Sequence, residues 1–302
     1  MGRYAFFWGC TIPARYPYME RSIRLVLETL RIDYCDLGGF TCCPEKTLVK
    51  NMRADLWETM AARNMAVAEE AGVDLMAACT GCFSTLKTVE SRMRTYPIEA
   101  DKINACLAEV GKVYRGKARA KHMIEVFHDE VGLSRIRDKV IYPLKGIRIA
   151  VHGGCHLVRP SSAIHFDDPF KPTKYDRIVE ALGAVTVDTK TKMMCCGGYL
   201  ARVGQQDMCH EMALVKLRDL RDNNVDAMTN TCPVCFKVYD NFQALIQRRG
   251  EKVHIPVLVV TELMALAFGY PPEEVGLSEH RIDCKPFLDK FEVAKQGVYA
   301  WA

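Results

Sequence analysis

The chain has 302 residues, 49% of them apolar, which is enough for two domains with their own cores. Its formal net charge of +4 comes from 41 basic and 37 acidic residues, and this small excess, with no long basic run, argues against nucleic-acid binding. No apolar stretch is long enough for a membrane span, and the first eight residues lack the features of a signal peptide, so we expect a cytoplasmic protein with no membrane span.

The first half predicts short apolar strands that alternate with amphipathic helices. In chain order the predicted elements are strand 4–8, helix 17–31, strand 32–37, helix 47–71, and a third strand that runs into Cys79 and opens another helix. The segment from about residue 84 to residue 145 is predicted to be mostly helical, with residues 140–145 as the connection to the second half.

The second half predicts the same order of elements. They are strand 147–152, helix 175–182, strand 184–187, helix 200–222, and a strand that runs into Cys232 and the next helix. A final strand, 255–260, and helix, 262–268, follow, and the residues after Pro271-Pro272 are predicted to wrap the surface as a C-terminal tail.

This repeated order predicts an α/β fold with two pseudo-repeated, Rossmann-like halves, each built on a small parallel sheet. We place the domain boundary near Lys145-Gly146, which gives a first domain, 1–145, with a helical connector and a second domain, 146–302, with the tail. Binding sites of such sheets lie beyond the carboxyl ends of the strands, where the N-termini of helices also point.

The cysteines follow the same repeat. The chain has 14 cysteines, and an adjacent pair is separated from a Cys-x-x-Cys by 35 residues in both halves. The gap before the pair is 31 residues in the first half and 39 in the second. The first set is Cys10, Cys42, Cys43, Cys79 and Cys82, and the second is Cys155, Cys195, Cys196, Cys232 and Cys235.

Five cysteines in one set favour an iron–sulfur site in each half. A structural zinc site closes with four ligands, and a thioredoxin-like motif uses two, so both leave cysteines unexplained. Neighbouring cysteines can place thiolates on neighbouring metal atoms, as a multinuclear centre requires. Zinc in at least one half and disulfides stay open as alternatives.

Residues outside this pattern have plainer interpretations. Cys35, Cys106, Cys209 and Cys284 are expected to be small buried side chains. The glycines near the cysteines are expected to allow positive φ or close approach of the backbone to a cluster: Gly9, Gly81, Gly154, Gly197 and Gly198. They do not form a Gly-x-Gly-x-x-Gly motif, so a dinucleotide site is not expected.

The motifs resemble a known family over nearly the whole chain. Cys195-Cys196-Gly197 shows the triplet of the CCG cysteine-rich domain, and Cys42-Cys43-Pro44 departs from it. The segments that begin at Gly9, His152 and Thr261 (GCTIPARYP, HGGCHLVRP and TELMALA) are similar to the B subunits of the CoB–CoM heterodisulfide reductases of methanogenic archaea. The resemblance implies that both domains are CCG domains.

The resemblance also implies the cofactors and the reaction. Each set of five cysteines would hold one noncubane [4Fe-4S] cluster. The mixed disulfide of coenzymes M and B would be cleaved between the two clusters, which take one sulfur atom each, to give two thiols. Electrons would come from the ferredoxin-like C subunit of the heterodisulfide reductase, connected to its flavin and iron–sulfur A subunit, with a hydrogenase or formate dehydrogenase as a further partner. The chain itself has no ferredoxin-type cysteine run.

Two histidines and four basic residues are candidates for the chemistry around the clusters. His152 and His156 flank Cys155 and are predicted proton donors, although either could simply hydrogen-bond a sulfide or pack under the loop. The substrate carries sulfonate, phosphate and carboxylate groups, which require cationic partners. The candidates follow cysteine motifs and could equally be solvated charges: Arg15, Lys46, Arg159 and Arg202.

Two other functions stay open. CCG domains also occur in succinate or fumarate reductases, lactate-utilisation proteins and sulfite-reduction complexes, where they pass electrons to quinones or thiols. The third candidate is a zinc-stabilised docking module without catalysis.

Overall fold

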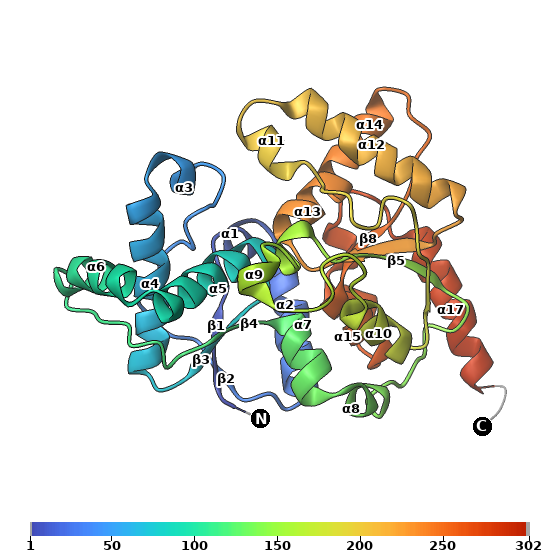
Figure 1. Ribbon diagram of the computed structural model, residues 1–302. Coiled ribbons are helices and arrows are strands. Elements are labelled where there is room, and N and C mark those ends of the chain that lie inside the picture. Colours follow the sequence, from blue (N-terminus) through green and yellow to red (C-terminus); the bar gives the residue numbers. More distant parts are fainter. Residues whose placement is uncertain (1, 300–302) are drawn as a thin grey trace. The chain divides into compact units, whose positions relative to one another are not determined.

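The computed structural model describes residues 2–299 and contains two four-stranded parallel sheets (Figure 1). The first sheet has the order β2-β1-β3-β4 and the second β6-β5-β7-β8. The strands of the first are β1 Tyr4–Phe7, β2 Tyr34–Cys35, β3 Asp74–Ala77 and β4 Ala120–His122. Those of the second are β5 Arg148–His152, β6 Val185–Thr186, β7 Ala227–Asn230 and β8 Val257–Val259. The predicted α/β fold with two pseudo-repeated halves is confirmed.

The first half of the chain contains one set of helices, of which α2 and α8 group with the second compact unit. They are α1 Thr11–Arg15, α2 Pro17–Thr29, α3 Val49–Met52, α4 Ala54–Glu70, α5 Thr80–Thr95, α6 Pro97–Ala108, α7 Met123–Glu125, a π-helical segment Val126–Val131, and α8 Leu133–Arg137. Helices α4 and α5 pack on each other and on β3. Strand β1 is buried along its whole length, as a central strand covered on both faces must be.

The second half contains the remaining helices and turns. They are the 3-10 turn Cys155–Leu157, α9 Ser161–Ile164, α10 Lys174–Ala181, α11 Gly198–Arg202, α12 Gln206–Asp222, α13 Pro233–Lys237, the π-helical segment Val238–Phe242, α14 Gln243–Arg248, α15 Val260–Ala267, α16 Pro272–Val275, the 3-10 turn Leu277–Glu279, and α17 Lys285–Tyr299. Helix α17 lies in the predicted tail and buries Phe287 and Phe291, so this tail is largely helical.

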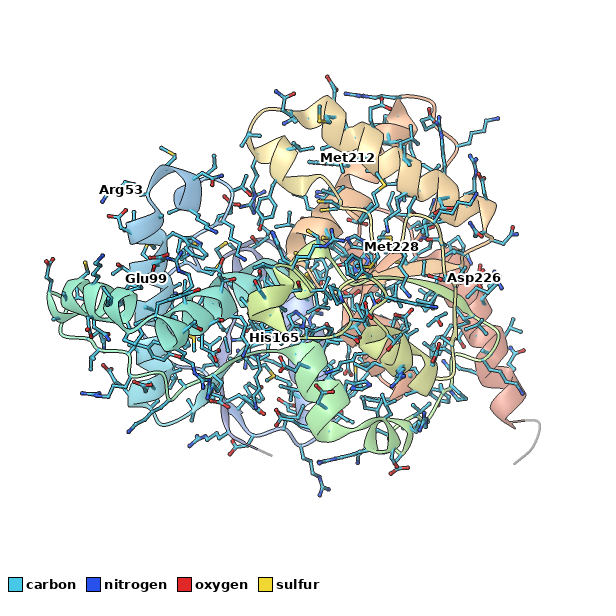
Figure 2. All side chains as sticks on the ribbon, viewed as in Figure 1. Arg53, Glu99, His165, Met212, Asp226 and Met228 are labelled. Carbon is cyan, nitrogen blue, oxygen red and sulfur yellow. The ribbon has the colours of Figure 1, made fainter. Side chains whose placement is uncertain are left out.

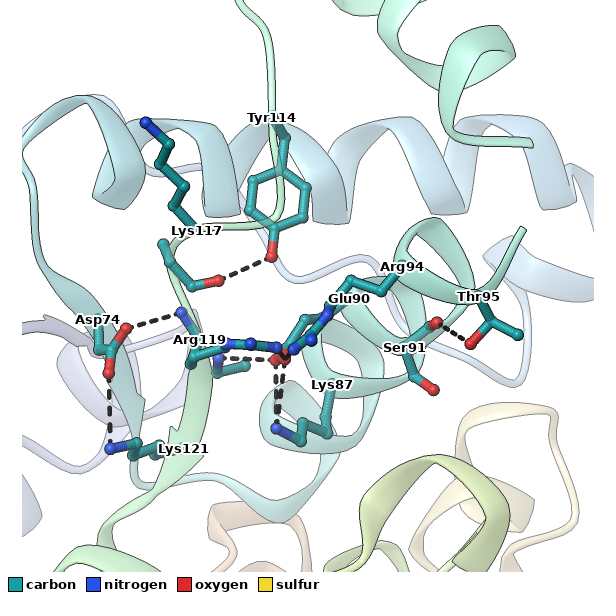
Figure 3. A network of polar contacts seen from close by, with 12 residues as sticks. Asp74, Lys87, Glu90, Ser91, Arg94, Thr95, Tyr114, Lys117, Arg119 and Lys121 are labelled. Carbon is teal, nitrogen blue, oxygen red and sulfur yellow. Dashed lines mark hydrogen bonds and ion pairs between the residues drawn. The ribbon is translucent and has the colours of Figure 1, made fainter. Parts of the chain in front are cut away.

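The segment 84–145 is mostly helical, as predicted, but it also contains strand β4, which was not predicted. The strand is held by the carboxylate of Glu90 on α5, which is 3% exposed and accepts hydrogen bonds from the backbone amide of Ala120 (2.9 Å) and from Arg119 (3.1 Å). Asp74 accepts from the Arg119 amide at 2.8 Å (Figure 3). Contacts over this distance in the chain leave no local pattern in the sequence.

The chain forms two compact units that are not continuous in sequence. Residues 15–31 group with the second sheet, and residues 156–172 group with the first. Helix α2 packs its buried Ile23, Val26 and Leu27 in the unit that contains α15, where the Ser22 and Thr261 hydroxyls are 2.8 Å apart. The boundary at residue 145 separates the two sheets along the chain, and the division into two linear domains stays a prediction.

A buried ion pair fixes α15, which carries the TELMALA motif. Glu262 closes the first turn by accepting a hydrogen bond from the Val259 amide at 2.8 Å. Its other oxygen lies 3.0 Å from Nε2 of His280, and both side chains are 0% exposed. Burial opposes the charge on His280, but Glu262 and a contact with Cys284 raise the pKa of His280 to about 11. The ring is therefore an imidazolium near neutral pH.

Candidate metal centres

The first five cysteines converge in one unit. Cys10 follows β1, Cys42 and Cys43 lie in the loop after β2, and Cys79 and Cys82 lie at the start of α5. The Cys43 thiol contacts those of Cys42 and Cys82 and lies within electrostatic reach of Cys10, and the Cys82 thiol also contacts Cys79. The predicted set is therefore assembled by the fold.

Burial divides this set into an inner and an outer part. Cys43, Cys79 and Cys82 are at most 9% exposed, whereas Cys10 and Cys42 are exposed. Gly9, just before Cys10, has φ +70°, and a Cβ added there would lie 3.0 Å from Sγ of Cys82. A side chain at position 9 would therefore intrude on the cysteines, as expected from the sequence.

The second five cysteines converge in the other unit. Sγ of Cys155 lies 4.0 Å from Sγ of Cys195, and Sγ of Cys235 lies 3.4 Å from Sγ of Cys196. Cys232 is the N-cap of α13, and its thiol contacts that of Cys235. Cys196, Cys232 and Cys235 are about 5% exposed, and the other two are half-buried. The distribution of burial resembles that of the first set.

Backbone amides bind sulfur in the second set. The Gly197 amide donates to Sγ of Cys195 and the Gly198 amide donates to Sγ of Cys196, both at 3.4 Å. A Cβ at Gly198 would lie 2.5 Å from Cγ1 of Val234, and one at Gly197 would lie 3.2 Å from Sδ of Met212, which is labelled on α12 in Figure 2. Glycine is therefore required for the chain to pass this close to the thiols.

The thiols strongly perturb one another. Hydrogen bonds from Cys155 and Cys196 lower the pKa of Cys195 to about 2, and the bond to Cys195 raises the pKa of Cys155 well above its ordinary value. In the first set, contacts with Cys42 and Cys82 lower the pKa of Cys43, and the contact with Cys43 raises that of Cys82. Because adjacent thiolates repel, a full set of five can ionise together only around a cation.

The donor set fits an iron–sulfur cluster. Thiolates are the ligands of such clusters, and Cys82 and Cys235 each lie in the first turn of a helix, where the macrodipole stabilises negative charge. Among residues 2–299, no three His, Cys, Asp or Glu side chains are arranged to hold a single metal ion. A cluster differs from a single ion because its ligands bind to separate iron atoms.

The two predicted proton donors have different surroundings. His152 ends β5, is 2% exposed, and has no hydrogen-bond partner for either ring nitrogen. Burial lowers its pKa to about 3, so its ring is neutral near pH 7. His156 is half-buried in the 3-10 turn that begins at Cys155. A proton-transfer role for either residue stays a prediction.

Lys46 is the most constrained of the four predicted basic contacts. Its Nζ lies 2.5 Å from Oγ of Ser84 and 3.2 Å from Oγ1 of Thr88, both on α5, two and six residues after Cys82. The side chain is half-buried, so its charge is held beside the helix that carries Cys82. A role in substrate binding stays a prediction.

The three arginines are exposed. Arg15 ends α1, and Arg202 ends α11 with its guanidinium 5.4 Å from the centre of the Tyr199 ring. The carbonyl oxygen of Arg159 accepts a hydrogen bond from Ser84 at 3.1 Å, which ties the segment after Cys155 to the first unit. Their predicted contact with substrate also stays a prediction.

The cysteines outside the two sets differ from one another. Cys209 and Cys284 are at most 3% exposed, as predicted. Cys106 is exposed and Cys35 is half-buried on the two-residue strand β2, so the prediction of burial is wrong for these two. Cys106 lies near the end of α6, where the helix presents only Ile103 and Leu107 to the core.

Three buried polar residues beside the second set were not predicted as site residues from the sequence. The ring of Tyr239 packs on His152 with 5.1 Å between centroids, Asn230 accepts a hydrogen bond from the Cys232 amide at 3.2 Å, and Lys216 is 1% exposed. The sequence contains a signal for Asn230, since a polar residue at the end of a buried strand lies at the functional edge of a parallel sheet. Tyr239 and Lys216 leave no such signal.

The chain is similar in sequence to known proteins. The family model of the cysteine-rich domain, CCG, matches residues 4–87 and 149–238. The B subunits of the ferredoxin/F420H2-dependent enzyme of Methanosarcina acetivorans and of the ferredoxin-dependent enzyme of Methanosarcina mazei, both named CoB-CoM heterodisulfide reductases, are 34% identical to the chain. Each match extends over 300 residues and covers 99% of this chain and 100% of the relative.

More distant relatives have other names. The 8-methylmenaquinol:fumarate reductase membrane anchor subunit of Wolinella succinogenes is 28% identical over 290 residues, which cover 93% of this chain and 97% of the relative. A hypothetical protein of Helicobacter pylori of known structure has a TM-score of 0.73 and 16% identity over 93% of this chain and 52% of its own, which supports the fold alone. Among the described residues, no helix is long and apolar enough to cross a membrane.

The matched residues of the domain model contain all ten cysteines of the two sets, and the reductase relatives align from end to end. This chain belongs to the CCG cysteine-rich domain family and, within it, to the family of heterodisulfide reductase B subunits, which are iron–sulfur subunits of oxidoreductases.

Proposed function

We propose that the chain is the catalytic subunit that reduces the mixed disulfide of coenzymes M and B to two thiols. The main support is the convergence of two complete cysteine sets in a chain that aligns end to end with the B subunits of heterodisulfide reductases. We further propose that each set holds one noncubane [4Fe-4S] cluster through Cys10, Cys42, Cys43, Cys79 and Cys82 or through Cys155, Cys195, Cys196, Cys232 and Cys235.

The reaction requires two electrons and two protons for each disulfide: RSSR′ + 2e⁻ + 2H⁺ gives RSH and R′SH. The bound clusters would supply the electrons and one iron site for each substrate sulfur atom. The chain would hold the clusters by its thiolates, and the buried cysteines of each set would limit the access of solvent to the cluster.

Proton delivery is proposed for the histidines that flank Cys155. His156 is the first candidate, because an imidazole directly after a ligand can hold a proton near the reacting sulfur. His152 is the second candidate, since its buried ring is neutral near pH 7 and must gain a proton before it can give one.

The anionic ends of the substrate are proposed to bind cationic side chains. Lys46 is the strongest candidate, because Ser84 and Thr88 already fix its ammonium group. Arg15, Arg159 and Arg202 are exposed and are the other candidates. Guanidinium groups suit sulfonate, phosphate and carboxylate through paired hydrogen bonds.

The electrons are proposed to come from partner proteins in the cytoplasm. The chain has no ferredoxin-type cysteine run, so the ferredoxin-like C subunit of the reductase would donate directly. The A subunit, which carries flavin and iron–sulfur centres, would supply the C subunit, with a hydrogenase or formate dehydrogenase further upstream.

Metal analysis followed by an activity assay tests this proposal. The anaerobically purified chain should contain iron and acid-labile sulfide in equal amounts and no zinc. The complex should release thiols from the mixed disulfide with a reduced viologen dye as donor. A colourless protein that contains zinc without iron would instead identify a docking module and refute every redox function.

A second candidate function is the transfer of electrons between quinones and a reductase. The Wolinella relative favours it, because that protein is named as part of a menaquinol:fumarate reductase. Turnover with a quinone, together with no release of thiol from the mixed disulfide by an intact, iron-loaded complex, would favour this second function.

A further inference from the structure

The two cysteine sets lie on equivalent strands and helices, but the side chains beside them differ. In the first sheet Phe7 pairs with Ala77, and in the second His152 pairs with Asn230. Phe7 and His152 each lie three residues before the first cysteine of their set, and Ala77 and Asn230 each lie two residues before the Cys-x-x-Cys. The strand register therefore places two apolar side chains in the first half where the second half has two polar ones.

The helix after the Cys-x-x-Cys repeats this difference. Leu86 lies four residues after Cys82 on the regular helix α5, and Tyr239 lies four residues after Cys235. Tyr239 falls in the π-helical segment Val238–Phe242, a local geometry that is common at functional sites. Its phenol lies within electrostatic reach of the thiols of Cys196, Cys235 and Cys195.

The polar atoms of this lining have no partner in the protein. Within residues 2–299, both ring nitrogens of His152, Nδ2 of Asn230 and the hydroxyl of Tyr239 are buried without a hydrogen bond. His152, Asn230 and Tyr239 are each at most 2% exposed. Buried donors are costly unless they have an acceptor, so three of them beside one set of thiols indicate an acceptor at that position.

A buried cation lies beside the same thiols. Lys216 is the one lysine among the described residues that is fully buried, and its Nζ donates a single hydrogen bond, to the Lys192 carbonyl at 3.2 Å. It lies within electrostatic reach of Cys235, Cys196 and Cys195. Burial lowers the pKa of Lys216 to about 8, which leaves the ammonium form predominant at pH 7.

We propose that His152, Asn230, Tyr239 and Lys216 donate hydrogen bonds and positive potential to the sulfur atoms of the second cluster and give it a higher reduction potential than the first. Reduction adds negative charge to a cluster, and donors aimed at its sulfur atoms stabilise that charge. Phe7, Leu86 and Ala77 offer no such donors to the first cluster. The inference rests on the proposed function in one respect, namely that both sets bind clusters.

Redox titration followed by electron paramagnetic resonance tests the inference on the intact, iron-loaded chain. A Cys43→Ser variant removes a ligand of the first cluster and so identifies the signal of the second. In the native chain we expect the second cluster to be reduced first. His152→Phe and Tyr239→Leu give the second set the residues of the first, and each should lower the midpoint potential of the second cluster. A tenfold change in the ratio of reduced to oxidised cluster corresponds to a shift of about 59 mV.

Two tyrosine variants separate a hydrogen bond from a packing effect. Tyr239→Phe keeps the ring and removes only the hydroxyl, so it should also lower the midpoint potential of the second cluster. Tyr175→Phe is the matched control, because the Tyr175 hydroxyl is buried in the same unit but is bonded to Thr229 at 2.9 Å. This control should leave both potentials unchanged.

The outcomes distinguish this inference from the proposed function. Two clusters that are reduced at the same potential, or a second cluster reduced after the first, would overturn the inference and leave the proposed function standing. An unchanged potential in Tyr239→Phe would exclude its hydroxyl as a donor to the cluster and overturn the inference as stated. A chain that shows no iron–sulfur signal would overturn both.

Discussion

Replacing His280 by Leu should destabilise the second unit strongly, because it breaks a fully buried ion pair. The Glu262 side chain is 0% exposed in the native structure, and without His280 the Val259 amide is the one donor to its carboxylate among residues 2–299. An uncompensated buried charge of this kind costs about 3–5 kcal/mol of unfolding free energy. For a unit of this size, that loss corresponds to a fall in Tm of roughly 6–20 °C.

A double-mutant cycle separates the loss of the ion pair from the loss of packing. His280 also packs on the rings of Tyr18 and Phe236, and Leu keeps part of that contact. Glu262→Gln is nearly isosteric and removes the charge, so the double variant should be more stable than His280→Leu alone. Thermal unfolding of the four anaerobic proteins, followed by circular dichroism at one scan rate, gives the comparison.

Two results would refute this reasoning. One is a fall in Tm below about 2 °C for His280→Leu, which corresponds to less than about 1 kcal/mol. The other is a double variant whose loss equals the sum of the two single losses, because independent effects would mean that the charges do not interact.

Three other expectations can be measured with the same preparations. The pKa of His280 in the folded chain is raised from 6.5 to about 11, so the stability that its charge contributes is complete below pH 6.5 and is lost as the pH rises toward 11. The difference in Tm between the native chain and His280→Leu should therefore narrow between pH 6.5 and 9.5. Cys196→Ser should remove about half of the bound iron and abolish turnover. Cys106→Ser, at an exposed cysteine outside both sets, should leave iron content and turnover unchanged. Native iron content in Cys196→Ser would contradict the proposed ligands of the second cluster. Gly198→Ala places a Cβ 2.5 Å from Val234 and should lower the unfolding free energy by about 1–3 kcal/mol and reduce the iron content. Gly38→Ala, whose Cβ would have no atom within 4 Å, should change neither quantity. Equal iron content in the two variants would refute this steric argument.

The repeat of cysteine spacing was sufficient to predict the two sets, because each cysteine follows a strand of a parallel sheet and such strands end at one edge. The glycines beside Cys10 and Cys196 were predictable for a similar reason, since their local geometry excludes a side chain. These features depend on neighbours in sequence or on the order of the strands.

Other features could not be predicted because they depend on contacts between distant residues. Strand β4 has three residues and is held by Glu90, thirty positions before Ala120. The packing of Tyr239 on His152 joins residues 87 positions apart, and the π-helical geometry around Tyr239 has no recognised sequence signal. The ligand assignments of the ten cysteines and the roles of the two histidines stay predictions.

The exchange of residues 15–31 and 156–172 between the compact units has a consequence for biosynthesis. When the first half leaves the ribosome, the apolar face of α2, with Ile23, Val26 and Leu27, has no partner until α15 has been translated more than 200 residues later. The first unit stays incomplete until residue 172 has been translated, and the second until α15 has been translated. A fragment that stops at residue 145 lacks segments of both units and should therefore be a target for chaperones and proteases.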